Sequence, residues 1–106
     1  MYARRVTMQL KPNSLGEFTQ KFENDVLPLL RKAKGFQDEM TFVAPGGSKA
    51  FAIDLWDRTE SADAYSRETY PTVVRLLEKC TEGNHQVETY EVCNSTFHKI
   101  AATVPA

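Results

Sequence analysis

Residues 15–33 read LGEFTQKFENDVLPLLRKA, and residues 62–80 read ADAYSRETYPTVVRLLEKC. In both stretches the apolar positions follow steps of 3, 4, 4, 3, 1 and 3 along the chain. This spacing is typical of a helix with one buried stripe. A short segment of alternating apolar residues precedes each stretch: Val6, Met8 and Leu10 in the first, and Phe51, Ile53 and Leu55 in the second. The sequence therefore predicts a strand followed by a helix, twice.

A further strand is predicted after each helix. The four expected strands cover about residues 4–10, 36–44, 49–58 and 85–97, and Pro45-Gly46-Gly47-Ser48 forms a hairpin between the second and the third. The order β-α-β-β-α-β indicates a ferredoxin-like α+β domain with a four-stranded antiparallel sheet. Right-handed crossovers place both helices on the same face of that sheet.

Caps and breaks are predicted within the two helices. Ser14 and Glu17 have the spacing of a capping box at the start of the first helix, and Gly35 suits the left-handed residue that follows its end. Pro28 and Pro71 lie inside the helical patterns, where a proline kinks or divides a helix.

The sheet face away from the helices is expected to be uncovered. In the predicted register it carries a mixed set of polar and large apolar side chains: Thr7, Gln9, Thr41, Val43, Trp56, Tyr90 and Val92. Leaving apolar area in water costs roughly 25 cal/mol per Å². A second copy packed sheet against sheet removes that cost, so the sequence predicts a homodimer, and the unusual length of the fourth strand favours the same interpretation.

Composition limits the class of protein. The 106 residues, 42% of them hydrophobic, suit one domain over residues 1–106, with a core over about 4–98 and a short tail over 99–106. Thirteen basic and 14 acidic side chains leave a formal charge of −1, so neither nucleic acid nor an anionic membrane is an expected partner. Apolar runs too short to span a bilayer and the absence of a signal-peptide pattern predict a cytoplasmic protein.

Cys80, near a helix end, and Cys93, inside the fourth strand, are expected to be free, partly buried thiols.

The chain from about Arg4 to Phe97 resembles the antibiotic biosynthesis monooxygenase-like family of the dimeric α/β-barrel superfamily. The resemblance rests on VLPLLRKAKGF (residues 26–36) and on FAIDLW (residues 51–56) running into DRTESADA (residues 57–64). It implies a dimeric barrel and one of three kinds of protein: a small cofactor-independent oxygenase acting on polycyclic phenols or quinols, a haem-degrading enzyme, or a protein with no settled activity. In the cofactor-independent type the protein supplies a dry aromatic pocket with polar groups that stabilise the phenolate.

The resemblance also indicates site residues. Trp56 matches the family's tryptophan at the end of the third strand, whereas the asparagine that oxygenases place shortly before it is absent, and Asp54 is the nearest polar residue. We therefore expect Trp56 to be catalytic. Tyr65 lies on the buried stripe of the second helix, where its hydroxyl could orient or deprotonate a substrate, so we expect it to be catalytic as well, in a pocket between the sheet and the helices. The expected substrate-binding residues are Phe18, Phe22, Tyr70, Asp54 and Arg58. The expected activity is oxidation of a small phenolic or quinol-like compound by O2 without metal, flavin or haem.

Structural roles compete with these functional ones. Trp56 can fill a sheet face or a dimer interface, and the Tyr65 hydroxyl can satisfy a backbone carbonyl in the core. Arg58 and Arg75 could hold an anionic substrate group, but single arginines on small domains are usually solvated. A dimer that binds a small hydrophobic or aromatic molecule without turnover remains the main alternative to an oxygenase.

Other classes of function are disfavoured. Haem degradation needs a histidine in the second helix and residues 59–81 contain none, while His85 and His98 lie at opposite ends of one strand and cannot share a metal ion. His85, after Gly83 and Asn84, is expected in an exposed turn. RNA-recognition modules share the strand order, but the third strand lacks their glycine and stacking ring, and Asp54 would repel phosphate.

Overall fold

A computed structural model describes residues 1–100, and the rest of the predicted tail, residues 101–106, lies outside the described residues. The elements follow in the order β1 (Tyr2–Leu10), α1 (Leu15–Lys21), η1 (Phe22–Val26), α2 (Leu27–Lys32), β2 (Phe36–Val43), β3 (Lys49–Trp56), α3 (Thr59–Glu68), α4 (Tyr70–Leu77) and β4 (Thr81–Glu91). All strand pairs are antiparallel, in the order β2-β3-β1-β4. The predicted ferredoxin-like α+β fold is confirmed.

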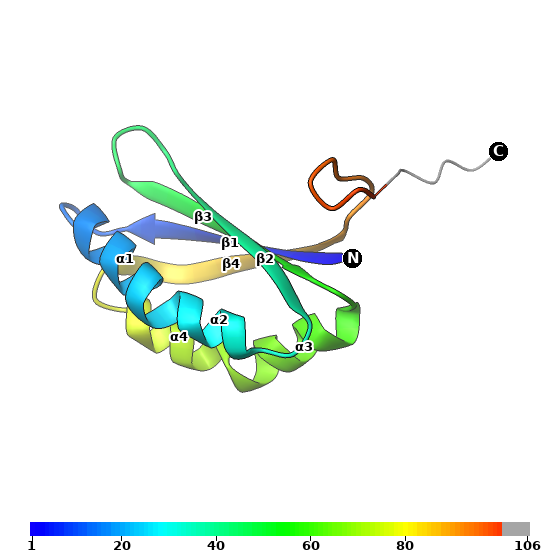
Figure 1. The fold of residues 1–106 in the computed structure, drawn as a ribbon. Helices are drawn as coiled ribbons and strands as arrows, with labels where there is room; N and C mark the ends of the chain where they lie inside the picture. Colours follow the sequence, from blue (N-terminus) through cyan, green and yellow to red (C-terminus); the bar gives the residue numbers. More distant parts are fainter. Residues whose placement is uncertain (101–106) are drawn as a thin grey trace.

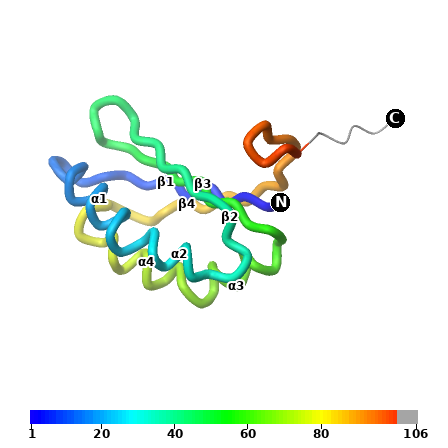
Figure 2. The backbone as a smooth tube through the Cα atoms, viewed as in Figure 1, coloured from blue at the N-terminus to red at the C-terminus, as the bar shows by residue number. Residues whose placement is uncertain are grey.

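All helices cover one face of the sheet, and the other face is left uncovered by them (Figures 1 and 2). The first predicted helix is divided into α1, a π-helical turn η1 and α2, with Pro28 in the first turn of α2. The second is divided at Thr69 into α3 and α4, with Pro71 in the first turn of α4. Both predicted proline breaks are confirmed, whereas the predicted capping box is wrong, because no side-chain hydrogen bond caps α1 at Ser14.

The predicted facing of β3 is wrong. Ala50, Ala52, Asp54 and Trp56 point toward the helices and are buried, while Phe51, Ile53 and Leu55 lie on the uncovered face. The small alanines leave room for the aromatic and aliphatic side chains of the helices. The prediction assigned the larger apolar residues of β3 to the buried face, and they lie on the other one. Because a shift of one residue reverses every side chain of a strand, the whole strand was assigned to the wrong face.

A bulge reverses part of β2 as well. Phe36 pairs with Trp56, but the next pair is Asp38 with Leu55, so one extra residue stands between them. Beyond this bulge Thr41 and Val43 face the helices beside Phe18, and Met40 and Phe42 lie on the uncovered face. The prediction that Thr41, Val43 and Trp56 lie on the uncovered face is therefore wrong.

Strand β4 begins and ends earlier than predicted. Thr81 and Glu82 pair with Leu10 and Gln9, and a register shift follows before Gln86 pairs with Thr7. Gly83, at a φ of 65°, makes this bulge, which the sequence prediction treated as a turn before the strand. Cys93 therefore lies beyond β4 and is exposed, not in a strand, while Cys80 is buried; both thiols are free.

The core lies between the sheet and the helices. Its fully buried large side chains are Trp56, Arg4, Phe18, Leu30, Leu77, Val26 and Cys80. None of the helices within residues 1–100 is long and apolar enough to cross a membrane. A charged arginine is rarely buried this deeply unless it is paired, so Arg4 needs a partner inside the core.

Gly35 holds the turn between α2 and β2 in the left-handed conformation, with a φ of 83°. A Cβ at this position would collide with Asp57 and Ser61 at the start of α3. We expect Gly35→Ala to lower the free energy of unfolding by about 2 kcal/mol, because strain and displacement of the two neighbours add. Urea denaturation checks this, with Gly46→Ala, at a comparable φ of 99° but in open space, as the matched control for backbone strain alone.

Candidate active site

The candidate site is built around a buried ion pair between neighbouring strands. Arg4 on β1 and Asp54 on β3 are cross-strand partners, and both point toward the helices. Arg4 Nη1 donates to Asp54 Oδ1 at 3.2 Å and Oδ2 at 3.0 Å, and the Arg4 side chain is only 1% exposed. Charges this deeply buried persist only when they are paired, so each residue fixes the other in place.

Trp56 supports this ion pair from the same strand. It is completely buried, and its indole Nε1 donates a hydrogen bond to Asp54 Oδ1. The Trp56 ring packs 5.7 Å from the ring of Phe36 and 5.0 Å from that of Tyr65, measured between ring centroids. Trp56 thus orients the Asp54 carboxylate from behind.

The Arg4 guanidinium lies against two tyrosine rings. Its Cζ is 5.0 Å from the ring centroid of Tyr65 on α3 and 4.8 Å from that of Tyr70 on α4. Contacts of this kind between a cation and an aromatic ring stabilise the buried charge. Two of the three guanidinium nitrogens, Nε and Nη2, have no hydrogen-bond partner among the described residues. An unmade hydrogen bond of a buried polar group costs about 1–3 kcal/mol, so these donors are a notable departure from ordinary packing.

A small cavity adjoins the guanidinium between sheet and helices. Its volume is about 20 Å³, enough for one water molecule. The polar groups on its wall come from Arg4, Asp54, Tyr65, Tyr70 and His85, and the remainder of the wall is apolar. Four titratable side chains and a buried arginine therefore meet around a space whose remaining wall is apolar.

A chain of hydrogen bonds leads from this cavity to the C-terminal end of α4. The Tyr70 hydroxyl lies 3.1 Å from His85 Nδ1, and His85 Nε2 lies 3.3 Å from Thr81 Oγ1. Because the Thr81 hydroxyl donates its own hydrogen to the carbonyl of Leu77 at 2.8 Å, Thr81 accepts from His85. His85 therefore carries its proton on Nε2 and accepts the Tyr70 hydrogen at Nδ1.

Burial sets the protonation states of these groups. It lowers the pKa of His85 from the ordinary value of 6.5, so the imidazole is neutral at pH 7. It raises the pKa of Tyr65 and of Tyr70, so both phenols keep their protons. Burial also raises the pKa of Asp54, and the Arg4 guanidinium opposes that rise. The cavity thus holds a neutral base, two neutral phenols and one ion pair.

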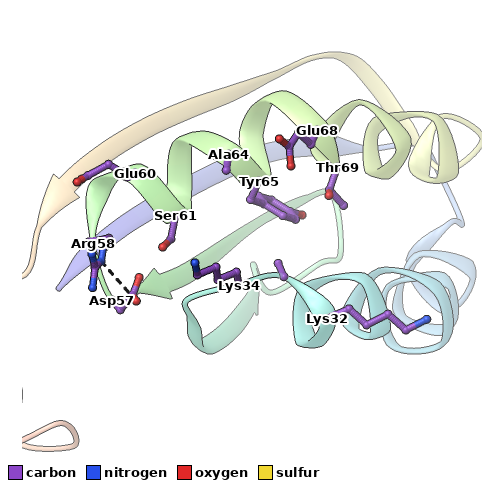
Figure 3. Close-up of a pocket in the computed structure, with 11 residues that line it drawn as sticks. Lys32, Lys34, Asp57, Arg58, Glu60, Ser61, Ala64, Tyr65, Glu68 and Thr69 are labelled. Atoms are coloured by element: carbon purple, nitrogen blue, oxygen red, sulfur yellow. Dashed lines mark ion pairs between the residues drawn. The ribbon is translucent and has the colours of Figure 1, made fainter.

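A wider cleft lies outside the cavity. It has a volume of about 580 Å³ and is lined by residues 32–34 at the end of α2, by 57–58 and by α3 with Thr69 (Figure 3). Tyr65 lines both this cleft and the inner cavity, and Figure 3 shows its ring projecting from α3 into the space between the helices. Tyr65 is therefore the side chain that separates solvent from the buried Arg4.

The predicted site residues are distributed over these spaces. Asp54, Tyr65, Tyr70 and Phe22 line the inner cavity, and Trp56 stands behind Asp54 without lining it. Phe18 and Phe22 line a separate groove of about 240 Å³ between α1, η1 and β2. Arg58 lies in the outer cleft with a largely exposed side chain, 3.7 Å from Asp57, away from the cavity.

Sequence reasoning missed Arg4 and misplaced His85, which is half-buried within β4 and not in an exposed turn. A signal for Arg4 was present, because it alternates with Val6, Met8 and Leu10 on the buried face of its strand. No comparable signal existed for His85, whose position depends on the bulge at Gly83.

Glu39 provides a pH test of the packing beside the site. Burial chiefly raises its pKa from 4.5 to about 6, and the nearby Asp54 adds to the rise. The folded state therefore binds more protons than the unfolded state between these two values, so this contribution to stability is complete below pH 4.5 and is lost as the pH rises to about 6. We expect wild type to lose on the order of 1 kcal/mol more than Glu39→Gln across this interval, allowing for solvent screening. Urea denaturation at both ends of the interval checks this, and parallel curves would contradict it.

Within residues 1–100 no group of three or more His, Cys, Asp or Glu side chains is placed to hold a metal ion. The polar groups on the cavity wall are a guanidinium, a carboxylate, two phenols and an imidazole.

No protein-family model and no curated protein matches this sequence. Solved structures do match: SnoaB, a cofactor-independent oxygenase from Streptomyces nogalater, superimposes with a TM-score of 0.73 at 10% identity, over 90% of this chain and 95% of that one. The chain has the antibiotic biosynthesis monooxygenase fold. A structure described as an antibiotic biosynthesis monooxygenase gives a TM-score of 0.70 at 14% identity, covering 87% of this chain and 98% of its own. NE2512, a protein of unknown function from Nitrosomonas europaea, gives a TM-score of 0.73 at 17% identity, over 99% of this chain and 94% of that one.

Proposed function

We propose that this monooxygenase-fold protein oxidises a small phenolic or quinol-like compound with O2, without a metal, flavin or haem, in the cavity beside Arg4. The observation that carries the proposal is the Tyr70–His85 hydrogen-bond chain, which joins a neutral base to that cavity. A phenol must lose a proton before it can reduce oxygen, and this chain offers the proton a path to His85.

The reaction then needs little further from the protein. As the substrate hydroxyl gives its proton to the Tyr70 oxygen, the Tyr70 hydrogen moves to His85 Nδ1. The substrate anion passes one electron to O2, and the resulting radical and superoxide combine at a ring carbon that carries hydrogen. The resulting peroxide anion takes the proton back from His85 through Tyr70 and then loses water together with the hydrogen of that ring carbon, so that phenol and O2 yield quinone and H2O. The apolar wall excludes solvent while these charged species exist.

The inner cavity must widen before such a substrate can bind, because it now has room for only one water molecule. Its helix-side wall contains Phe22, in the π-helical turn η1, and Tyr70, next to the break at Thr69. Interrupted helices give way more easily than continuous ones, since their backbone ladders are already broken there. We therefore place the substrate in the widened cavity beside Arg4, and its ring enters from the outer cleft past Tyr65.

Trp56 and Tyr65, both expected to be catalytic, have different roles in this proposal. Tyr65 contacts the substrate directly, since it lines the cavity. Trp56 acts as a positioning residue through the hydrogen bond that it donates to Asp54. Phe22, which lines the cavity, contributes to substrate binding in this proposal, whereas Phe18 in the separate groove and Arg58 in the outer cleft do not line the cavity.

The homodimer is also part of the proposal. The uncovered face presents Met40, which is 58% exposed, together with Phe42 and Tyr90, and a second copy packed there removes this apolar area from water. Native mass spectrometry checks the assembly, with a species of twice 12.0 kDa expected. A monomer at micromolar concentration would contradict the shared barrel.

Oxygen uptake by protein treated with a chelator tests the reaction itself. A panel of hydroquinones and anthrones should consume O2 faster than their spontaneous oxidation, and the excess should disappear after heat denaturation. The alternative of a binding protein without turnover is supported by Asp54, whose carboxylate is already occupied by Arg4 and Trp56. Saturable binding of these compounds with no excess oxygen uptake would favour that alternative.

A further inference from the structure

We propose that Arg4 is an anion receptor that selects aromatic ligands carrying an ionised hydroxyl group, and this inference rests on the proposed function. It concerns binding and not turnover, so it can be tested without any reaction. It is based on the unpaired donors of the buried Arg4 guanidinium, and no motif in the sequence predicts these donors.

The donors are the first step of the argument. A guanidinium has five N–H groups in one plane, and Asp54 engages only those of Nη1. The Nε–H and both N–H groups of Nη2 have no partner in the described part of the chain, although Arg4 is 99% buried. These three donors lie in a fork that matches one or two anionic oxygens.

The surroundings of the guanidinium restrict the ligand further. The rings of Tyr65 and Tyr70 lie against Arg4, while the unpaired N–H groups remain in its plane and Arg4 forms part of the cavity wall. An anion reaching those N–H groups must therefore bring a flat group that fits between aromatic rings. A phenolate meets both requirements, because its oxygen lies in the plane of its ring.

The two charges of the ion pair act in opposite directions on an oxygen bound here. Arg4 favours the ionised form and Asp54, on the Nη1 side, disfavours it, while the neutral His85 and Tyr70 add no negative charge. Direct hydrogen bonds from the unpaired Nε and Nη2 groups therefore decide in favour of the anion. In a dry site, hydrogen bonds from a cation to an anion are about twice as strong as those between neutral groups. A purely apolar cavity would do the opposite and favour the neutral phenol.

The test compares two ligands of nearly the same shape, 4-nitrophenol and its methyl ether 4-nitroanisole, which cannot ionise. Binding is followed through quenching of Trp56, the single tryptophan of the chain, and through the absorption of the 4-nitrophenolate. At a pH where 4-nitrophenol is ionised in water, wild type should bind it at least about tenfold more tightly than the ether. Bound 4-nitrophenol should also ionise at a lower pH than free 4-nitrophenol.

Two variants locate this preference. Arg4→Lys keeps a positive charge for Asp54 but loses the planar fork, so the tenfold preference should fall to near unity. Arg5→Lys makes the same change one residue away, on the uncovered face beside Phe51, and should keep the preference. If Arg4→Lys does not fold, the wild-type comparison of the two ligands decides alone.

Equal binding of the two ligands by wild type, tighter binding of the ether, no saturable binding of 4-nitrophenol, or a preference retained in Arg4→Lys would each overturn the inference. Its failure is distinguishable from failure of the proposed function. A phenolate preference without oxygen uptake refutes the oxygenase and leaves the receptor standing. Oxygen uptake without a phenolate preference does the reverse.

Discussion

Asp54→Ala is expected to lower the free energy of unfolding by about 3–5 kcal/mol. The substitution leaves the Arg4 guanidinium, 1% exposed, without its only hydrogen-bond acceptor within residues 1–100. It also leaves the Trp56 indole N–H without the carboxylate that accepts its hydrogen bond. An unpaired charge and an unpaired donor are thus buried together, and neither can reach water without disrupting the core.

Urea denaturation measures this loss, provided that the dependence of the unfolding free energy on urea stays unchanged. The control is the double variant Arg4→Met with Asp54→Asn, in which the charge is removed and an amide oxygen remains to accept from Trp56. It should recover most of the stability, because the penalty arises from the uncompensated charge. A loss below about 1 kcal/mol in Asp54→Ala would show that the pair is not buried as described.

His85→Gln is expected to lower kcat by about 100-fold, with little change in KM. A glutamine at position 85 can still accept the Tyr70 hydrogen bond, but its amide cannot take up a proton. If His85 is the proton acceptor, the variant keeps the shape of the cavity and loses the base. Steady-state oxygen uptake with the best substrate of the panel provides the measurement.

The pH profile separates this role from a structural one. Burial lowers the pKa of His85 below 6.5, so the active neutral form predominates at pH 7 and activity should decline only as the pH falls below that value. The same shift makes the unfolded state bind more protons in this range, so stability also falls on acidification below 6.5. His98→Gln, which changes the chain's other histidine, beside Asp38, should retain the wild-type profile. If His85→Gln keeps the acid limb of the profile, the proton path through His85 is wrong.

The order of elements could be predicted because local signals agreed with one another. The matched apolar spacing predicted two helical segments, Pro28 and Pro71 predicted a break in each, and Gly35 predicted the turn before β2. The structure has all of these features. The facing of β3 and part of β2 could not be predicted, since the larger apolar residues of β3 lie on the uncovered face and a bulge after Phe36 changes the alternation of β2. Strand facing depends on what covers each side, and a single strand does not contain that information.

The site was predictable only in part for a related reason. Asp54, Tyr65 and Tyr70 could be proposed from position and resemblance, and the structure brings them to one cavity. Arg4 and His85 come from strands at opposite ends of the sequence, and pairing in the sheet is what joins them. Contacts between residues so far apart arise from topology, which residue spacing does not reveal.

A buried ion pair is rarely the most stable choice for a core. Well-packed apolar residues in its place are often neutral or stabilising by about 1–4 kcal/mol. Arg4 additionally leaves two nitrogens unpaired among the described residues, which adds to the cost. Such an arrangement is better explained by a ligand that uses these donors than by a contribution to folding, in line with the trade between stability and activity at functional sites.

The most direct test of the account is oxidation of anthrone under isotopically labelled O2 by protein freed of metals with a chelator. A monooxygenase inserts one oxygen atom into the product and reduces the other to water. We predict a quinone that carries one labelled oxygen, formed by wild type faster than the spontaneous reaction and formed by His85→Gln only at a rate near that background. Product formation at the spontaneous rate with wild type would contradict the central claim that the cavity beside Arg4 is an oxygenase site.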